Sequence, residues 1–253
     1  MVNLRLHLLF LVVIVCSFTC AAQQRESDLL SNIFKNNKGE SLPYRLFVPP
    51  HYDPHRKYPL VVYLHGGGGV GNDNRKQIQG GNRYLIDLFT DPDTQTKNPA
   101  FVLAPQSDGD GWVEAKDLTK GTRQLHLVVE LIESLPKTYN IDVTRLYVSG
   151  QSLGGFGSFA IVSEYPQLFA AAIPLCGGGD ESKTARLTST RWWIFHGEKD
   201  TSVPVGRSRS MVAAIKKAGG QVKYTEYPGE GHIIWTKVVK EPGLLEWLFL
   251  QHK

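Results

Sequence analysis

Short apolar runs alternate along this chain with stretches in which apolar side chains recur every three or four positions. The runs are typical of buried strands, and the wider spacing is typical of helices that bury one face. Strands are predicted at residues 42–48, 58–64, 145–149, 170–175, 191–195 and 221–228, the first of them at a sheet edge. Helices are predicted at residues 75–89, 121–139, 155–162, 205–218 and 236–251. This alternation predicts an α/β fold with a mostly parallel central sheet covered by helices on both faces.

A Gly-Gln-Ser-Leu-Gly segment, residues 150–154, lies between a predicted strand and a predicted helix. A sharp turn in this position presents its serine at the edge of the sheet. Gly150 and Gly154 have no Cβ that would block a strained backbone or the close approach of the helix. Ser152 is therefore a candidate nucleophile.

A glycine-rich loop, His-Gly-Gly-Gly-Gly at residues 65–69, directly follows the predicted strand 58–64. A tetrahedral intermediate of acyl transfer carries a negative oxygen, and backbone N–H groups reach it only where no side chain intervenes. We expect the N–H of Leu153, together with that of Gly67 or Gly68, to form an oxyanion hole.

A carboxylate and a histidine follow the last two predicted strands. Asp200 comes after residues 191–195, and His232 comes after residues 221–228 and before the terminal helix. The chain order Ser152, Asp200, His232 is that of the α/β-hydrolase catalytic triad. In such a triad the histidine accepts the serine proton and the aspartate orients the imidazole.

Other residues compete for these roles. Glu198 is close to Asp200, and Asp180 and Glu181 lie on a loop where some hydrolases place the acid. The resemblance to α/β-hydrolases implies Asp200, because an Asp followed by Val-Pro, here Val203-Pro204, is the arrangement of that family. His65 and His196 each border a loop of the predicted site, so we expect them to hold these loops through hydrogen bonds.

The chain resembles secreted α/β-hydrolases of the esterase and predicted-peptidase group, near feruloyl-esterase-like and polyhydroxybutyrate-depolymerase-like enzymes. The resemblance covers the chain from about Leu42 onward and includes several less generic segments. These are residues 64–66 followed by Gly-Asn-Asp-Asn at 71–74, Ala-Pro-Gln at 104–106 with Trp112, and His-Ile-Ile-Trp at 232–235 ahead of Trp247. It implies an α/β-hydrolase fold and the same triad, but the group contains both peptidases and esterases, so the substrate stays open.

The first 22 residues have the pattern of a cleaved signal peptide, with Arg5, an apolar run at residues 8–15 and Ala21-Ala22 at the end. We therefore expect a secreted or periplasmic protein with a catalytic domain at residues 23–253. A lipid anchor on Cys20 is the less favoured alternative, because Ser17 and Thr19 depart from the lipoprotein pattern. The apolar run is shorter than the ~18 residues of a membrane span, so no stable membrane partner is expected.

Charge and metal-binding patterns exclude several other functions. A leader with one arginine and no acid would take the formal net charge from +4 to +3, and the basic residues are scattered, so we expect no nucleic-acid partner. No His, Cys or carboxylate cluster has metal-ligand spacing, and residues 72–74 lack the other ligands of a calcium loop. We therefore expect no metal and no cofactor. Cys176 is expected to be a small buried residue.

Only residues 177–190 separate two predicted strands at the place where many hydrolases insert a lid. We therefore expect no large lid domain and an open site, with Trp112 and Trp235 as candidate walls for the substrate. The predicted function is hydrolysis of carboxylic esters, small or polymer-linked, such as acyl or feruloyl esters on polysaccharide, through an acyl-enzyme on Ser152. The alternatives are a secreted serine peptidase of the prolyl-oligopeptidase-like type and a non-catalytic binding module on the same fold.

Overall fold

The computed structural model describes residues 28–109 and 111–253. The predicted signal peptide, the alternative lipid site at Cys20 and the boundary at residue 22 lie outside the described residues, so they stay predictions. Among the residues that the structure describes, no helix combines the length and the hydrophobicity that crossing a bilayer requires.

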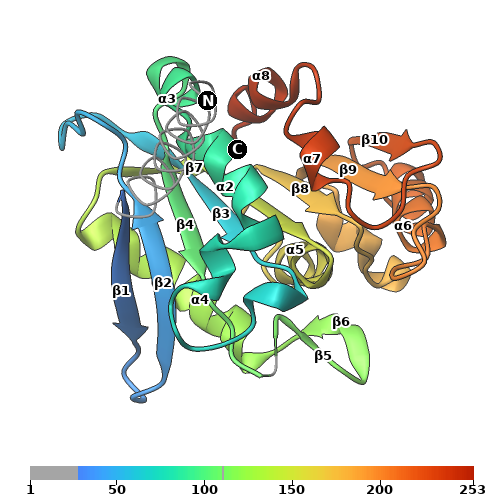
Figure 1. The fold of residues 1–253 in the computed structure, drawn as a ribbon, viewed down its shortest axis with the longest axis horizontal. Helices are drawn as coiled ribbons and strands as arrows, with labels where there is room; N and C mark the ends of the chain where they lie inside the picture. Colours follow the sequence, from blue (N-terminus) through green and yellow to red (C-terminus); the bar gives the residue numbers. More distant parts are fainter. Residues whose placement is uncertain (1–27, 110) are drawn as a thin grey trace, which may run out of the picture.

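The core of the fold is an eight-stranded sheet in the order β1-β2-β4-β3-β7-β8-β9-β10 (Figure 1). The pairs β1/β2 and β2/β4 are antiparallel, and the remaining neighbours are parallel. The strands are β1 (Leu29–Lys35), β2 (Ser41–Phe47), β3 (Tyr58–Leu64), β4 (Phe101–Pro105), β7 (Ile141–Gln151), β8 (Ala171–Leu175), β9 (Arg191–Gly197) and β10 (Val222–Tyr227). This sheet confirms the predicted fold class.

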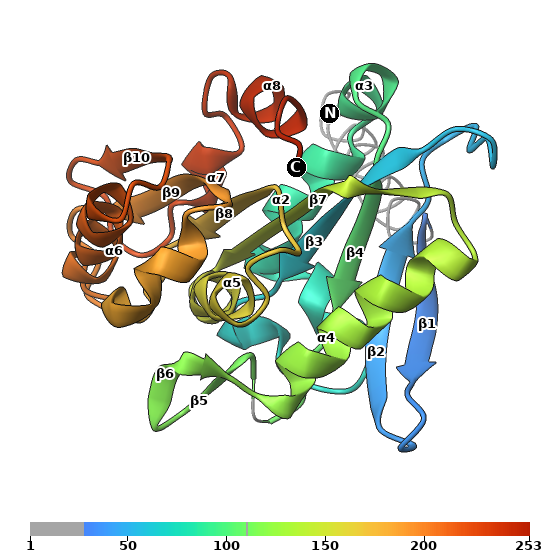
Figure 2. The same ribbon diagram turned by 180° about the vertical axis from the view of Figure 1, so that it is seen from behind.

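Helices cover both faces of the sheet (Figures 1 and 2). One face is covered by α4 (Arg123–Ser134), α5 (Leu153–Glu164) and α6 (Gly206–Lys217). The other is covered by α2 (Arg83–Thr90), α7 (Trp235–Val238) and α8 (Leu244–Phe249), while α3 (Pro92–Lys97) follows α2. Since side chains alternate across a strand, β3 can supply both layers.

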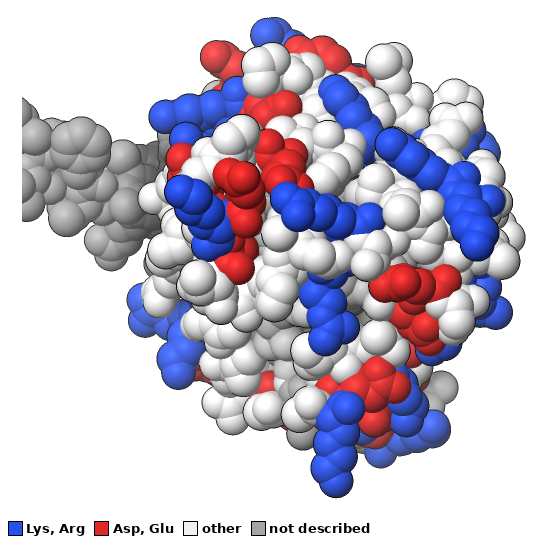
Figure 3. All heavy atoms as spheres, turned by 90° about the vertical axis from the view of Figure 1, so that its right-hand side faces the viewer, with Lys and Arg blue, Asp and Glu red and all other residues white. Residues whose placement is uncertain are grey.

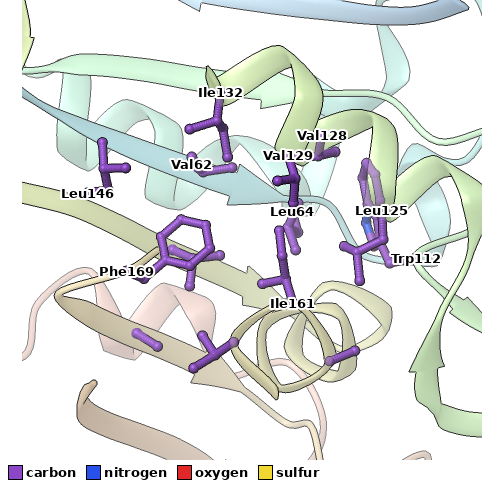
Figure 4. Packing of buried hydrophobic residues seen from close by; sticks show 14 of the residues in the cluster. Val62, Leu64, Trp112, Leu125, Val128, Val129, Ile132, Leu146, Ile161 and Phe169 are labelled. Carbon is purple, nitrogen blue, oxygen red and sulfur yellow. The ribbon is translucent and has the colours of Figure 1, made fainter. Parts of the chain in front are cut away.

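The core on the α4 and α5 side shows this alternation directly (Figure 4). Val62 and Leu64 of β3 lie in the same apolar cluster as Val129 of α4 and Ile161 of α5. Val61 and Tyr63, the intervening residues of β3, lie in the cluster on the opposite face. All seven residues of β3 are buried, which explains why this strand reads as a continuous apolar run.

Four predicted elements differ from the structure. The helix predicted at 121–139 ends at Ser134 and is followed only by the 3₁₀ turn η4 (Leu135–Lys137), because Pro136 cannot continue the helical hydrogen bonds. The strand predicted at 42–48 is present as β2, but it is not an edge strand, because β1 pairs with its outer side. The helix predicted at 75–89 begins only at Arg83; before it lie two single 3₁₀ turns, η2 (Lys76–Ile78) and η3 (Gly80–Asn82), and Gly80 has a φ of 54°. The helix predicted at 236–251 is divided into α7 and α8, because Gly243 has a φ of 76°, which does not fit a helix.

The carboxyl ends of the parallel strands position the candidate site. β3 leads into the glycine loop, β7 into Ser152, β9 into the segment with Asp200 and β10 into the segment with His232. The connection after β4 forms a small hairpin of β5 (Val113–Glu114) and β6 (Asp117–Gly121) that packs beside α5. Between β8 and β9 the only regular element is η5 (Glu181–Leu187), so no lid domain lies there.

Candidate active site

Ser152 occupies a strained turn between β7 and α5. Its φ of 54° and ψ of −114° are rare for any residue with a Cβ. The turn is held by two hydrogen bonds, in which the Ser152 N–H donates to the Leu175 carbonyl at 2.8 Å and the Ser152 carbonyl accepts from the Phe156 N–H at 3.1 Å. Such a conformation persists only where surrounding structure enforces it.

The two glycines that flank the serine are required by close backbone contacts. A Cβ on Gly154 would lie 1.9 Å from the Leu64 carbonyl oxygen of β3, and a Cβ on Gly150 would lie 2.4 Å from the Gly154 carbonyl oxygen. Both distances are far below van der Waals contact, so the helix could not approach the sheet with any larger residue at either position. The reason predicted from the sequence for these glycines is confirmed.

Ser152, His232 and Asp200 lie together in one hydrogen-bonded chain. Ser152 Oγ is 2.9 Å from His232 Nε2, and His232 Nδ1 is 2.7 Å from Asp200 Oδ2. The Asp200 side chain is fully buried, whereas the His232 side chain keeps 19% of its exposure. In this arrangement Nδ1–H can donate to the carboxylate while Nε2 accepts the serine proton, which is the geometry that general-base activation of a hydroxyl requires.

The buried Asp200 carboxylate is stabilised in its charged form. Its Oδ1 accepts from the N–H groups of Ser202 at 2.9 Å and Val203 at 2.8 Å. Burial alone would raise the pKa of Asp200, but the hydrogen bond from His232 and those from the two amides outweigh it and hold this pKa below its ordinary value. The competing acids are engaged elsewhere. Glu198 accepts from the Gly229 N–H, and Asp180 caps η5, where Glu181 is the first residue.

His65 anchors the glycine loop from inside the protein. Its Nε2 accepts from the Ser107 N–H at 3.0 Å, so the proton is assigned to Nδ1, which donates to the Gly66 carbonyl at 2.7 Å. Burial lowers the pKa of His65 to about 4, which keeps the ring neutral. Because the peptide is planar and trans, fixing the Gly66 carbonyl also fixes the Gly67 N–H, which points away from His65.

Two residues that were not among the predicted site residues complete the support of this loop. The buried Asn82 accepts from the Gly66 N–H at 2.8 Å through Oδ1, and Gln106 donates to the Gly69 carbonyl at 3.1 Å through Nε2. Gln106 belongs to the Ala-Pro-Gln segment noted in the sequence. Nothing in the sequence around Asn82 indicates this role, because its contact with Gly66 depends on how the turns before α2 fold back.

The amides of Gly67, Gly68 and Leu153 are the candidate oxyanion donors. Within the described part of the chain they donate to no acceptor, and Gly67 and Gly68 are exposed. Leu153 is the first residue of α5, where a backbone N–H has no intrahelical partner. Unused donors at a helix start beside a nucleophile can stabilise a developing negative oxygen.

The two candidate tryptophans have different environments. Trp112 is fully buried, packs 4.7 Å from the His65 ring and donates through Nε1 to the His65 carbonyl at 3.0 Å. It is therefore a core residue that supports the glycine loop, and its prediction as a substrate wall is wrong. Trp235 is 8% exposed and lies perpendicular to the His232 ring at 5.7 Å, and its role as a substrate wall stays a prediction.

Cys176, His196 and Asp200 form the one cluster of three potential metal ligands among residues 28–109 and 111–253, with ligand atoms within 4.8 Å of one another. Their polar atoms have protein partners. The Cys176 thiol donates to the His232 carbonyl at 3.5 Å, and both His196 nitrogens contact protein acceptors or hydroxyls. Burial and the nearby Asp200 raise the pKa of Cys176, which disfavours the thiolate that metal binding needs. The cluster is therefore arranged as a hydrogen-bonded network.

The sheet order, the two helical layers and a Ser-His-Asp chain at the carboxyl edge define an α/β-hydrolase. The protein belongs to the Esterase family, described as "Putative esterase", which matches residues 36–221. A solved structure described as a thermostable esterase has a TM-score of 0.85 and 41% identity, and the match covers 90% of this chain and 64% of that one.

Curated relatives include esterases and peptidases. Poly(3-hydroxyalkanoate) depolymerase C of Paucimonas lemoignei is 33% identical over 52% of this chain and 30% of its own length. Probable feruloyl esterase C of Aspergillus terreus is 26% identical over 76% of this chain and 66% of its own length. Venom dipeptidyl peptidase 4 of Vespa velutina is 22% identical over 84% of this chain and 31% of its own length. The chain spans less than two thirds of each relative's length.

Proposed function

We propose that this protein is a serine hydrolase that cleaves carboxylic esters through an acyl-enzyme on Ser152. The observation that carries the proposal is the continuous chain from Ser152 Oγ through His232 to Asp200, with distances of 2.9 and 2.7 Å. Membership of the Esterase family supports ester hydrolysis as the reaction class. A non-catalytic binding module would have no need for a strained serine or for three unused amides beside it.

The proposed reaction has two acyl-transfer steps. In the first, His232 Nε2 accepts the Ser152 proton as Oγ attacks the ester carbonyl, and the imidazolium then protonates the departing alcohol oxygen. In the second, His232 accepts a proton from water, the hydroxide attacks the acyl carbon and Ser152 regains its proton. Asp200 stabilises the transient imidazolium, and the Leu153 amide with that of Gly67 or Gly68 binds the oxyanion.

We further propose that residues 1–22 direct secretion or periplasmic export and that residues 23–253 form the catalytic domain. The substrate would then be small esters or esters on extracellular polymers, such as acyl or feruloyl groups on polysaccharide. The relatives named as a polyhydroxyalkanoate depolymerase and a feruloyl esterase support a polymer-linked ester, and the short segment between β8 and β9 supports an open site.

A fluorophosphonate probe and the Ser152→Ala variant test the proposal together. The probe should label Ser152 in the wild type and leave Ser152→Ala unlabelled. The variant should fold normally but lose roughly 10³-fold or more in activity on a short-chain aryl ester. Near-wild-type turnover by Ser152→Ala would remove the central claim.

The second candidate is a serine peptidase that uses the same three residues. The similarity to a dipeptidyl peptidase over 84% of this chain favours it. Aryl esters, methyl ferulate, acetylated xylan and short peptides should be compared side by side as substrates. Efficient peptide cleavage with negligible esterase activity would establish the peptidase, whereas the ester proposal expects the reverse.

A further inference from the structure

A second histidine contacts the same carboxylate oxygen as His232. His196, at the end of β9, is completely buried, and its Nε2 lies 3.2 Å from Asp200 Oδ2. The His232 Nδ1 lies 2.7 Å from that oxygen. His196 Nε2 also lies 2.9 Å from the Val203 carbonyl, so it faces two acceptors at once.

The other side of the His196 ring is held by α6. His196 Nδ1 is 2.7 Å from Ser208 Oγ, and Ser208 Oγ is 3.1 Å from the Gly177 carbonyl. Ser208 is fully buried. The ring therefore connects the acid loop, helix α6 and the segment that follows β8, and it has little freedom to rotate.

The protonation of His196 follows from its partners. Burial lowers the pKa of His196, so the ring is neutral and carries one proton. That proton is assigned to Nε2, because a bare Nε2 facing the oxygens of Asp200 and Val203 would leave lone pairs in repulsive contact. Nδ1 then accepts the single hydroxyl proton of Ser208, which is 2.7 Å away, in preference to the Gly177 carbonyl at 3.1 Å from the same hydroxyl.

The charged and titratable groups around His196 are few. Asp200 and His232 lie on one side, with the buried thiol of Cys176 near Asp200. On β10, Glu226 pairs in register with His196, and its carboxylate is held by Arg209 at 2.9 Å. Glu226 therefore already has a cationic partner, and Asp200 is the carboxylate in hydrogen-bond reach of His196.

We propose that His196 is a positioning residue that orients Asp200 and shares its negative charge through an Nε2–H donor. A donor on Oδ2 reduces how strongly Asp200 attracts the imidazolium form of His232. The buried ring thereby extends activity toward lower pH, because it moves the acid limb of kcat/KM in that direction. This inference rests on the proposed serine-hydrolase function.

The test is the pH profile of kcat/KM on a soluble short-chain ester. His196→Phe removes the donor. The acid limb should then move toward higher pH by about half a pH unit or more, because Asp200 stabilises the imidazolium form of His232 more strongly. His196→Gln can place its side-chain amide N–H at the Nε2 position and should stay close to the wild type. His55→Phe, which makes the same change at an exposed histidine, is the matched control and should keep the wild-type limb.

Two results in the pH profiles would overturn the proposal: an unmoved acid limb in His196→Phe, or equal shifts in His196→Phe and His196→Gln. Nitrogen-15 NMR of the histidines in the wild type provides a test that needs no functional variant, with the His196 signal assigned by its loss in His196→Gln. A proton on Nδ1 rather than Nε2 at neutral pH would equally exclude the donor. Failure of the proposed function is distinguishable, since Ser152→Ala would then keep its activity.

Discussion

The burial of the His65 ring makes the free energy of unfolding depend on pH. Its pKa is lowered to about 4 from the ordinary 6.5, so between these values the unfolded chain binds a proton that the folded chain does not. The free energy of unfolding should therefore fall as pH decreases through this window, with about 2 kcal/mol lost from this group between pH 6.5 and 5. Well above pH 6.5, where the unfolded chain has also lost this proton, the group adds no pH dependence.

Urea unfolding at a series of pH values measures this effect. His65→Asn should be less stable than the wild type at neutral pH, because the support of the glycine loop is weakened, yet its stability should depend less on pH. His55→Asn, at an exposed histidine, is the control and should keep the wild-type slope. Identical slopes for His65→Asn and the wild type would show that His65 is not the group that titrates.

Gly67 and Gly68 allow the oxyanion hole to be tested without damage to the fold. A Cβ at either position would meet no atom within 4 Å, and neither residue has a positive φ. Alanine should therefore change the free energy of unfolding by less than about 1 kcal/mol. At the glycine whose amide binds the oxyanion, the added methyl group should lower kcat by about 10-fold or more.

The matched control is Gly206→Ala at the start of α6, where a Cβ also meets no atom within 4 Å. It should leave kcat unchanged. If alanine at both Gly67 and Gly68 preserves kcat on a short-chain ester, this loop does not contribute the oxyanion donor.

At the scale of elements, the close contact between helix α5 and strand β3 depends on the absence of a Cβ at Gly154. The Gly154 Cβ position lies 1.9 Å from the Leu64 carbonyl oxygen, which is backbone and cannot rotate away. Gly154→Ala should therefore destabilise the protein by more than about 3 kcal/mol or prevent folding. Chemical unfolding beside Gly206→Ala checks this, and a stable, fully active Gly154→Ala would contradict the packing described for α5.

The elements that could be predicted were those with a strong local pattern. β3 reads as an apolar run because every one of its residues is buried, whereas β1 leaves Leu30 and Ile33 exposed and has no clear alternation. The hairpin of β5 and β6 is short and polar, so nothing in its sequence distinguishes it from a loop. α2 begins later than predicted, and the predicted terminal helix is divided into α7 and α8, because a glycine with positive φ interrupts each helical pattern.

The same limit applies to the site. Ser152, Asp200 and His232 follow strands and carry local motifs, so their meeting at one sheet edge could be expected, while their catalytic roles stay predictions. The contacts of Asn82 with Gly66 and of His196 with Ser208 join segments without any pattern. The direction in which Trp112 points depends on the hairpin connection, which the sequence did not reveal.

For the whole molecule, the formal net charge of +4 gives little electrostatic preference. Figure 3 shows basic and acidic side chains intermixed on the face that includes α6 and β10. Ion pairs such as Arg209 with Glu226 and Lys237 with Glu230 account for part of this mixing. We therefore expect kcat/KM on a neutral ester to change less than about twofold between low and high salt. A steep salt dependence would indicate a charged substrate path.

The short connection between β8 and β9 also predicts the kinetics with poorly soluble esters. Since only η5 lies between β8 and β9, no lid has to move before substrate enters. The rate on a short-chain ester should rise smoothly with concentration through the solubility limit. A jump at that limit, or a strong preference for long-chain triglycerides, would mean that a lipid interface activates the protein.

The strained backbone of Ser152 lowers the stability of the fold at the position of the candidate nucleophile. Its φ of 54° and ψ of −114° mirror an ordinary extended conformation, which glycine adopts without strain. Ser152→Gly should thus be more stable than Ser152→Ala by about 1 kcal/mol, although neither retains the hydroxyl. Selection for thermal resistance alone would favour glycine at this position, so the serine persists at the expense of a more robust fold.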